Sequence, residues 1–228
     1  MLDTKNNYDV TKFDRPSVTV DVLFFTIIDN KLNVLLIKRA AWPYEGYWAL
    51  PGGFVDMNED LDEAAKREIY EECGVKDLYL EQLYTFGEPK RDPRTRVITV
   101  AYYALAPKTE IKNIQKSEAN EARYFPVETL PKLAFDHKKI IEFGFQRLKN
   151  KMGYSNIVFG LLPESFPLSD VQNIYESIYG HSVDKRNFRK WVISSGLVEP
   201  TGKILSGKAH RPAALYRFTN REVVFTDK

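Results

Sequence analysis

The stretch from Gly53 to Val75 constrains the fold of this chain more than any other part of its sequence. Apolar residues recur every fourth position there, at Leu61, Ala65, Ile69 and Cys73, which is the spacing of one helix face. Asp62 is a candidate N-cap, and Gly74 is the residue that most readily stops a helix. We therefore predict a helix that begins near Asp62 and ends at Gly74.

Three carboxylates share one edge of this predicted helix. Glu68, Glu71 and Glu72 stand at positions i, i+3 and i+4, so their side chains meet. Like charges at this spacing repel, and hard oxygen ligands of this kind suit Mg²⁺ or Mn²⁺. The alternative is an ordinary solvated helix face, since glutamate is a good helix former.

The spacing around these glutamates separates the two alternatives. The order is Gly53, five residues, Glu59, seven residues, Arg67-Glu68, an aliphatic, any residue, Glu71-Glu72, any residue, Gly74 and an aliphatic. This order resembles the Nudix box at every specified position, and the chain is identified as a member of that superfamily. The resemblance implies that residues 1–150 form an α/β/α sandwich with a mixed sheet. It also implies a site that holds a divalent cation against a nucleoside diphosphate linked to another group.

The resemblance also implies roles for the box residues. Those matching Glu68, Glu71 and Glu72 bind metal, and Glu71 is in addition a candidate catalytic carboxylate. Glu59 and Arg67 are expected to pair across the start of the helix and fix the ligands, and Gly53 fits a tight turn.

The segments around the box read as strands and a closing helix. Aromatic and β-branched composition predicts strands over residues 17–28, 32–39, 78–86 and 96–105. Residues 120–131 resemble the strand and loop that close Nudix domains, where Glu121 or Glu118 is the candidate general base, or an ordinary loop carboxylate. His137 is expected at the exposed start of a helix that runs to about Lys151.

Two loops carry the candidate substrate contacts. Arg39 ends a strand beside an aromatic loop that contains Trp48, which either stacks a nucleobase or covers the end of the sheet. The proline-bounded loop over residues 87–96 contains Arg91 and Arg94 and suits a diphosphate, and it resembles the loop of Nudix proteins that handle ADP-ribose. For Arg39 a surface salt bridge is the alternative.

The charge of the chain is unevenly divided. The net charge of +2 is composed of −2 over residues 1–150 and +4 over residues 151–228. After a Gly, Ser and Pro connector over residues 153–167, helices are predicted over 168–180 and 184–193, the second with Phe188, Trp191 and Val192 facing inward. Two strands near residues 197–203 and 213–218 then enclose a basic loop.

Helix, turn, basic helix and basic hairpin in this order are typical of a winged helix-turn-helix domain over residues 151–228. Its candidate DNA contacts are the basic, amide and imidazole side chains of the second helix and the wing: Lys185, Arg186, Asn187, Arg189, Lys190, Lys208, His210 and Arg211. The whole arrangement resembles the bacterial Nudix-related transcriptional regulators. The alternative is a basic face on a small module that binds another partner.

The resemblance implies a regulator that binds double-stranded DNA as a homodimer and responds to an ADP-ribose-like nucleotide or a sugar. Many such regulators have eroded boxes, whereas this box is complete, so hydrolysis with Mg²⁺ is also expected. The competing reading is a Nudix hydrolase that converts ADP-ribose to AMP and ribose 5-phosphate, with the tail serving dimerisation or cleft closure.

The remaining composition favours a cytoplasmic protein without a membrane partner. The longest apolar run, residues 22–28, is too short to span a bilayer, and the N-terminus has no signal-peptide core. Cys73 is the single cysteine, so no intrachain disulfide is possible.

Overall fold

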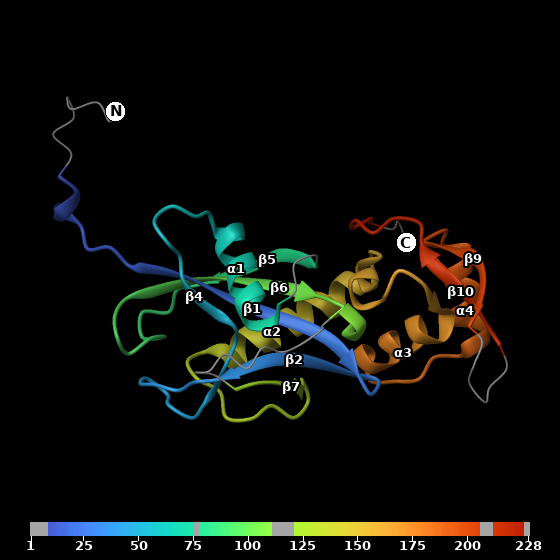
Figure 1. Ribbon diagram of the computed structural model, residues 1–228, viewed down its shortest axis with the longest axis horizontal. Coiled ribbons are helices and arrows are strands. Elements are labelled where there is room, and N and C mark those ends of the chain that lie inside the picture. The colour runs from blue at the N-terminus through green and yellow to red at the C-terminus, as the bar shows by residue number, and fades with distance from the viewer. Residues whose placement is uncertain (1–8, 75–77, 111–120, 206–211, 226–228) are drawn as a thin grey trace.

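The computed structural model describes residues 9–74, 78–110, 121–205 and 212–225 of the chain (Figure 1). A large sheet with its helices occupies the left and centre of Figure 1, and a smaller unit occupies the right-hand end. Short 3₁₀ helices lie at Val10–Lys12 and Lys108–Glu110. No helix in the described part of the chain is long and apolar enough to cross a membrane.

The large sheet is mixed, as predicted. Its strands are β1 (Ser17–Ile28), β2 (Lys31–Lys38), β3 (Trp48–Ala49), β4 (Gly52–Phe54), β5 (Tyr79–Phe86), β6 (Val97–Leu105) and β7 (Ala122–Pro126). The main order is β3-β2-β1-β6-β5, with β4 paired to β1 and β7 paired to β2. β1 runs parallel to β6 and antiparallel to β2, so the centre of the sheet joins the first hairpin to the second strand after the box.

Alternating side chains of β1 divide the core into two layers. Val20, Val22 and Phe24 pack on α1 (Leu61–Cys73) through residues that include Ala65 and Ile69. Leu23 and Phe25 point to the other face and pack on α2 (His137–Met152). Because successive residues of a strand face opposite sides, one apolar strand supports a helix on each face. The predicted α/β/α sandwich is confirmed.

The N-terminus of α1 differs from the prediction by two residues. Asp60, not Asp62, is the N-cap: its carboxylate accepts from Glu63 N at 2.8 Å, and the Glu63 carboxylate accepts from Asp60 N at 3.0 Å. This reciprocal capping box satisfies two donors at once. Asp62 instead accepts a hydrogen bond from Tyr102 Oη at 2.6 Å. The predicted stop is confirmed, since Gly74 adopts φ 68°, where a side chain would be strained.

The smaller unit has the helices and hairpin of a winged helix, which confirms that prediction. It contains α3 (Leu168–Tyr179), α4 (Lys185–Ser194), β8 (Phe166–Pro167), β9 (Val198–Leu205) and β10 (Ala213–Phe218), with sheet order β8-β10-β9. Phe188 and Val192 of α4 are buried as expected, but Trp191 is 46% exposed, so its predicted inward orientation is wrong. Its ring lies at the edge of the core, against Tyr175 and Phe188.

The predicted connector is in fact part of the core. Residues 157–161 form a buried 3₁₀ helix, η3 (Ile157–Leu161), within the segment predicted as a connector from its Gly, Ser and Pro residues. They belong to one apolar cluster that continues from Leu23 of the large sheet to Val192 of α4. Gly160 permits this approach, because a Cβ there would lie 2.7 Å from the Leu105 Cβ. The boundary between the two predicted domains therefore lies within shared apolar packing.

Candidate functional site

Arg67 holds the carboxylates at the start of α1 together. Its guanidinium donates to both Glu59 oxygens, at 2.6 and 3.0 Å, and to Glu68 Oε1 at 2.7 Å. The Arg67 hydrogen bonds lower the pKa of Glu59 to about 2 and raise that of Arg67 itself. Bidentate pairing of this kind fixes direction as well as charge. Arg67 thus fixes the orientation of Glu68, which is the role the sequence predicts for it.

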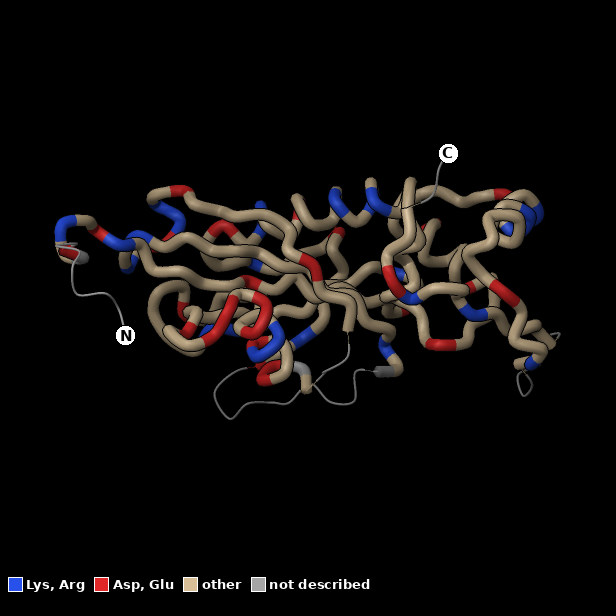
Figure 2. The backbone as a smooth tube through the Cα atoms, turned by 90° about the horizontal axis from the view of Figure 1, so that it is seen from above, with Lys and Arg blue, Asp and Glu red and all other residues tan. Residues whose placement is uncertain are grey.

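The three predicted metal ligands differ in their surroundings. Burial raises the pKa of Glu68, and burial together with the charges of Glu68 and Glu71 raises that of Glu72. Glu71 is exposed, with Oε2 3.7 Å from Arg67 Nη1. Gly53 packs directly on the Glu68 carboxylate, and any side chain at that position would displace it. Figure 2 shows the acidic positions gathered at this helix.

The donor set suits a hard divalent cation. Within the described residues no three His, Cys, Asp or Glu side chains already stand in the arrangement that would hold a metal ion. Glu68, Glu71 and Glu72 nevertheless offer carboxylate oxygens, and burial together with repulsion from Glu68 and Glu71 raises the pKa of Glu72. A divalent cation would relieve that repulsion, and carboxylate oxygens are the ligands that Mg²⁺ and Mn²⁺ accept. The residues present therefore fit such an ion.

A pocket of about 250 Å³ lies beside this helix, between β1, β4, the loop over residues 87–96 and the start of α2. Arg39 and Arg94 line it together with Phe54 and Phe135. The Arg39 guanidinium lies 4.9 Å from the Phe135 ring centroid, and that of Arg94 lies 5.4 Å from Phe54 and 5.8 Å from Phe135. The alternating cations and aromatic faces suit a ligand with both phosphate and planar groups.

Arg91, a predicted substrate contact, is buried. Its guanidinium donates to both Asp136 oxygens, at 2.8 and 3.2 Å, and to Asp21 Oδ2 at 3.1 Å. Burial alone would lower the pKa of Arg91, but these two carboxylates outweigh burial and raise it. Arg91 lines the pocket, yet its donors are largely engaged in joining β1 to α2. Its place as a direct ligand contact stays a prediction.

His137 is buried, so its predicted surface position is wrong. Its Nδ1 accepts from Leu50 N at 2.8 Å, and its Nε2 lies 3.5 Å from Asp21 Oδ1. Burial lowers the pKa of His137, more than the nearby carboxylates raise it. The neutral ring with a proton on Nε2 fits both neighbours. The sequence does not indicate this burial, because a single histidine at the start of a helix does not show which distant residues pack against it.

Two further predicted contacts lie elsewhere. Trp48 packs edge-on against Phe125, with 4.7 Å between ring centroids, and does not line the pocket. Glu121 pairs with Lys38, at 3.4 Å, and with Arg123. Glu118 lies outside the described residues. The roles of Trp48 in stacking and of Glu121 as general base therefore remain predictions.

Sequence reasoning missed four residues that shape the pocket: Asp21, Phe54, Phe135 and Asp136. Asp21 had a signal, because an acidic residue inside an otherwise uncharged strand must find a partner when buried. Phe135 had none. It adopts φ 52°, an uncommon conformation for a bulky residue, which turns the chain into α2.

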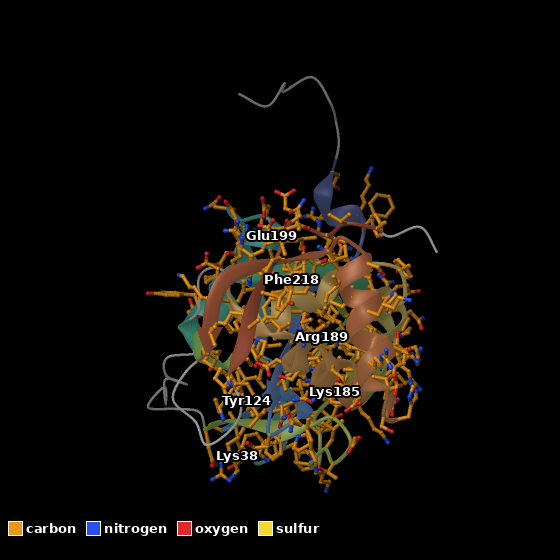
Figure 3. All side chains as sticks on the ribbon, turned by 90° about the vertical axis from the view of Figure 1, so that its right-hand side faces the viewer. Lys38, Tyr124, Lys185, Arg189, Glu199 and Phe218 are labelled. Atoms are coloured by element: carbon orange, nitrogen blue, oxygen red, sulfur yellow. The ribbon has the colours of Figure 1, made fainter. Side chains whose placement is uncertain are left out.

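The basic helix α4 presents the predicted nucleic-acid face. Lys185, Arg186, Asn187, Arg189 and Lys190 are all exposed, while Asp184 caps the helix by accepting from Asn187 N at 2.8 Å. Arg189 Nη2 also lies 3.4 Å from Tyr216 Oη on β10. Figure 3 looks onto this end of the molecule, with Lys185 and Arg189 labelled. Lys208, His210 and Arg211 of the predicted wing lie outside the described residues.

Both halves of the chain match known protein families. Residues 18–143 match the family described as NUDIX domain, and residues 158–218 match the NrtR DNA-binding winged helix domain. The ADPR responsive transcriptional repressor NtrR of Acinetobacter baylyi is 41% identical over 96% of this chain and 88% of its own length. An ADP-ribose pyrophosphatase of Methanocaldococcus jannaschii is 42% identical over 59% of this chain and 76% of its own.

Solved structures agree with these matches. Shewanella oneidensis NrtR complexed with a 27mer DNA has a TM-score of 0.80 and 35% identity, over 89% of this chain and 93% of that one. The NUDIX domain of the same protein complexed with ADP ribose has a TM-score of 0.56 and 36% identity, over 62% of this chain and 94% of that one.

The burial of His137 predicts a pH effect on stability. Because its pKa in the folded chain is below the unfolded value of about 6.5, the unfolded chain takes up the proton first as pH falls. The free energy of unfolding should therefore decrease below about pH 6.5, with this group contributing a slope of up to about 1.4 kcal/mol per pH unit. His137→Asn, whose amide can still accept from Leu50 N, should flatten that slope in urea titrations between about pH 6.5 and about pH 5.

The control for this measurement is His181→Asn, which changes an exposed histidine. It should keep the wild-type dependence on pH. An unchanged slope in His137→Asn would contradict the assignment of a buried neutral imidazole.

Proposed function

This chain belongs to the NrtR family, whose members join a NUDIX domain to a DNA-binding winged helix, and we propose that it is an ADP-ribose-responsive transcriptional repressor. In this proposal α4 binds operator DNA and the pocket beside α1 binds ADP-ribose. The observation that carries it is the presence in one chain of an exposed basic helix and an arginine-and-aromatic pocket next to a complete Nudix box. The similarity to a repressor over nearly the full length supports the same conclusion.

The test uses the full chain and an operator duplex, defined as DNA that the protein itself selects from a randomised pool. Fluorescence anisotropy should detect binding at low salt, and added ADP-ribose should release the duplex. Linkage then requires that operator DNA weaken ADP-ribose binding by the same factor. The proposal fails if no duplex is selected or if ADP-ribose leaves the affinity for DNA unchanged.

We further propose that α1 holds Mg²⁺ or Mn²⁺ through Glu68, Glu71 and Glu72 and that the domain hydrolyses its effector. A bound cation would neutralise charge on the phosphoryl oxygens and lower the pKa of a water. Glu59 and Arg67 would hold Glu68 in place, and Gly53 would leave room for its carboxylate. Glu71 and Glu121 are the candidate catalytic carboxylates. The similarity to an ADP-ribose pyrophosphatase supports this reading.

A second candidate function is that of a hydrolase alone. In that reading the product pair is AMP and ribose 5-phosphate, and the tail serves dimerisation or cleft closure. The complete box favours it over a pure sensor, whereas the exposed cations of α4 favour the regulator. The DNA selection above separates the two.

Substituting Glu72→Gln should abolish metal-dependent hydrolysis of ADP-ribose while the fold survives. Loss of one charge-stabilising group in an active site costs on the order of 100-fold in rate. The half-buried Glu72 has a raised pKa, so neutralising it relieves repulsion in the metal-free protein. Release of AMP with Mg²⁺ and thermal unfolding are the two measurements. Glu142→Gln, an exposed carboxylate of α2, is the control, and equal turnover in both variants would refute the metal assignment.

Arg189→Ala should weaken operator binding by about 1–3 kcal/mol if Arg189 contacts a base. Lys190→Ala should instead lower the salt dependence of binding, as expected of a phosphate contact. Lys66→Ala, an exposed cation on α1, controls for the loss of one charge anywhere on the surface. Titrations at several salt concentrations distinguish the variants. If Arg189→Ala binds operator as tightly as Lys66→Ala, the result would contradict the proposed placement of α4 in the DNA interface.

We also propose that the repressor is a homodimer. One winged helix covers little DNA, and useful affinity requires two copies on half-sites about 34–36 Å apart. Light scattering should give twice the 26.4 kDa mass of one chain at concentrations that bind operator. A selected operator without two-fold symmetry, together with a monomer mass, would contradict this arrangement.

A further inference from the structure

Helix α2 connects the pocket to the winged helix. Its first residues, Asp136 at the N-cap and His137, lie at the pocket, and its last turn meets α3. A helix of 16 residues spans about 24 Å. One rigid element therefore runs from the effector pocket to α3 of the winged helix.

The pocket end of α2 is held by specific contacts. Arg91 donates to both oxygens of Asp136, so the N-cap carboxylate is tied to the loop over residues 87–96 and not to its own helix. The preceding residue, Phe135, lies with its ring near the guanidinium groups of Arg39 and Arg94. A ligand that engages these two arginines must meet the Phe135 ring, which leads directly into α2.

The far end of α2 is capped by α3. Tyr179 Oη donates to Lys149 O at 3.1 Å, and Tyr175 Oη donates to Met152 O at 3.3 Å. The last carbonyls of a helix have no partner within it, and these two hydroxyls supply one from the other helix. The Lys149 ammonium also lies 5.5 Å from the Tyr179 ring centroid.

Tyr175 also contacts α4, the helix proposed to bind DNA. Its ring centroid lies 5.2 Å from that of Phe188 and 5.5 Å from that of Trp191, both on α4. The same side chain therefore contacts the end of α2 and the core side of the helix that carries Arg189. Because packed interfaces shift between discrete arrangements and do not deform continuously, a displacement of α2 would move α3 and α4 with it.

We propose that α2 transmits the state of the effector pocket to the winged helix, and that Tyr175 and Tyr179 are the positioning residues that join it to the DNA-binding unit. This inference rests on the proposed function, since it requires both ligands. It names the regulatory contact within that function. Neither tyrosine touches the pocket or lies on the exposed face of α4, so their hydroxyls should matter for coupling and not for either ligand alone.

The experiment measures coupling in the full chain. The affinity for an ADP-ribose analogue, with a methylene group between its phosphorus atoms to prevent hydrolysis, is determined with and without saturating operator duplex. The ratio of the two dissociation constants is the coupling factor. The double variant Tyr175→Phe/Tyr179→Phe removes both hydroxyls and keeps both rings. Ser177→Ala is the control, because its hydroxyl bonds to Ile174 O within α3 and does not cross to α2.

The double variant should lower the coupling factor at least threefold, while its affinity for the analogue alone and for operator alone each stays within about twofold of wild type. Ser177→Ala should keep the wild-type factor. A double variant that keeps the wild-type factor would overturn the role of α2 and leave the proposed function intact. A wild-type factor of one would instead overturn the proposed function and this inference with it. If the double variant unfolds, Tyr179→Phe alone is measured by the same criteria.

Discussion

The buried guanidinium of Arg91 is the interaction on which the site depends. It stands between Asp21 of β1 and Asp136 at the start of α2. His137 lies beside the Asp21 carboxylate. Removing one partner from such a group leaves an uncompensated buried charge, which costs roughly 3–5 kcal/mol. The sheet, the loop over residues 87–96 and α2 are thus fixed relative to one another by these buried ion pairs. The same ion pairs therefore fix the positions of the elements that line the pocket.

The helix of the Nudix box, by contrast, keeps carboxylates that still repel one another. Arg67 neutralises Glu59 and Glu68, but Glu72 keeps a raised pKa from burial and from its neighbours' charges. The unrelieved repulsion is what makes this edge receptive to a cation. The paired charges around Arg91 therefore set the shape of the pocket, whereas the carboxylates of the neighbouring helix α1 still repel one another and suit a cation.

The two halves of the chain share a continuous apolar cluster and not a flexible linker. Gly160 lets the buried segment η3 pack against Leu105 of β6, and Arg221 donates to the carbonyls of Phe159 and Leu162. Polar groups of Asn156 likewise bind the backbone at Asn220, Glu222 and Val224. This packing favours movement of the two halves of the chain as packed bodies, so a displacement of one half would also displace the other.

The sequence by itself determined the features that depend on neighbouring residues. The helical edge of Glu68, Glu71 and Glu72, the stop at Gly74, the strand pattern of the sandwich and the basic face of α4 all follow from local periodicity, so they could be predicted. Only the tertiary structure decided the contacts between distant segments. Arg91 meets Asp21 across 70 residues and Asp136 across 45, and His137 meets Leu50 across 87. Such pairs have no spacing rule, because the fold as a whole determines which side chains share a buried space. For the same reason the sequence placed His137 at the surface and Trp191 facing inward, whereas packing buries His137 and leaves Trp191 46% exposed.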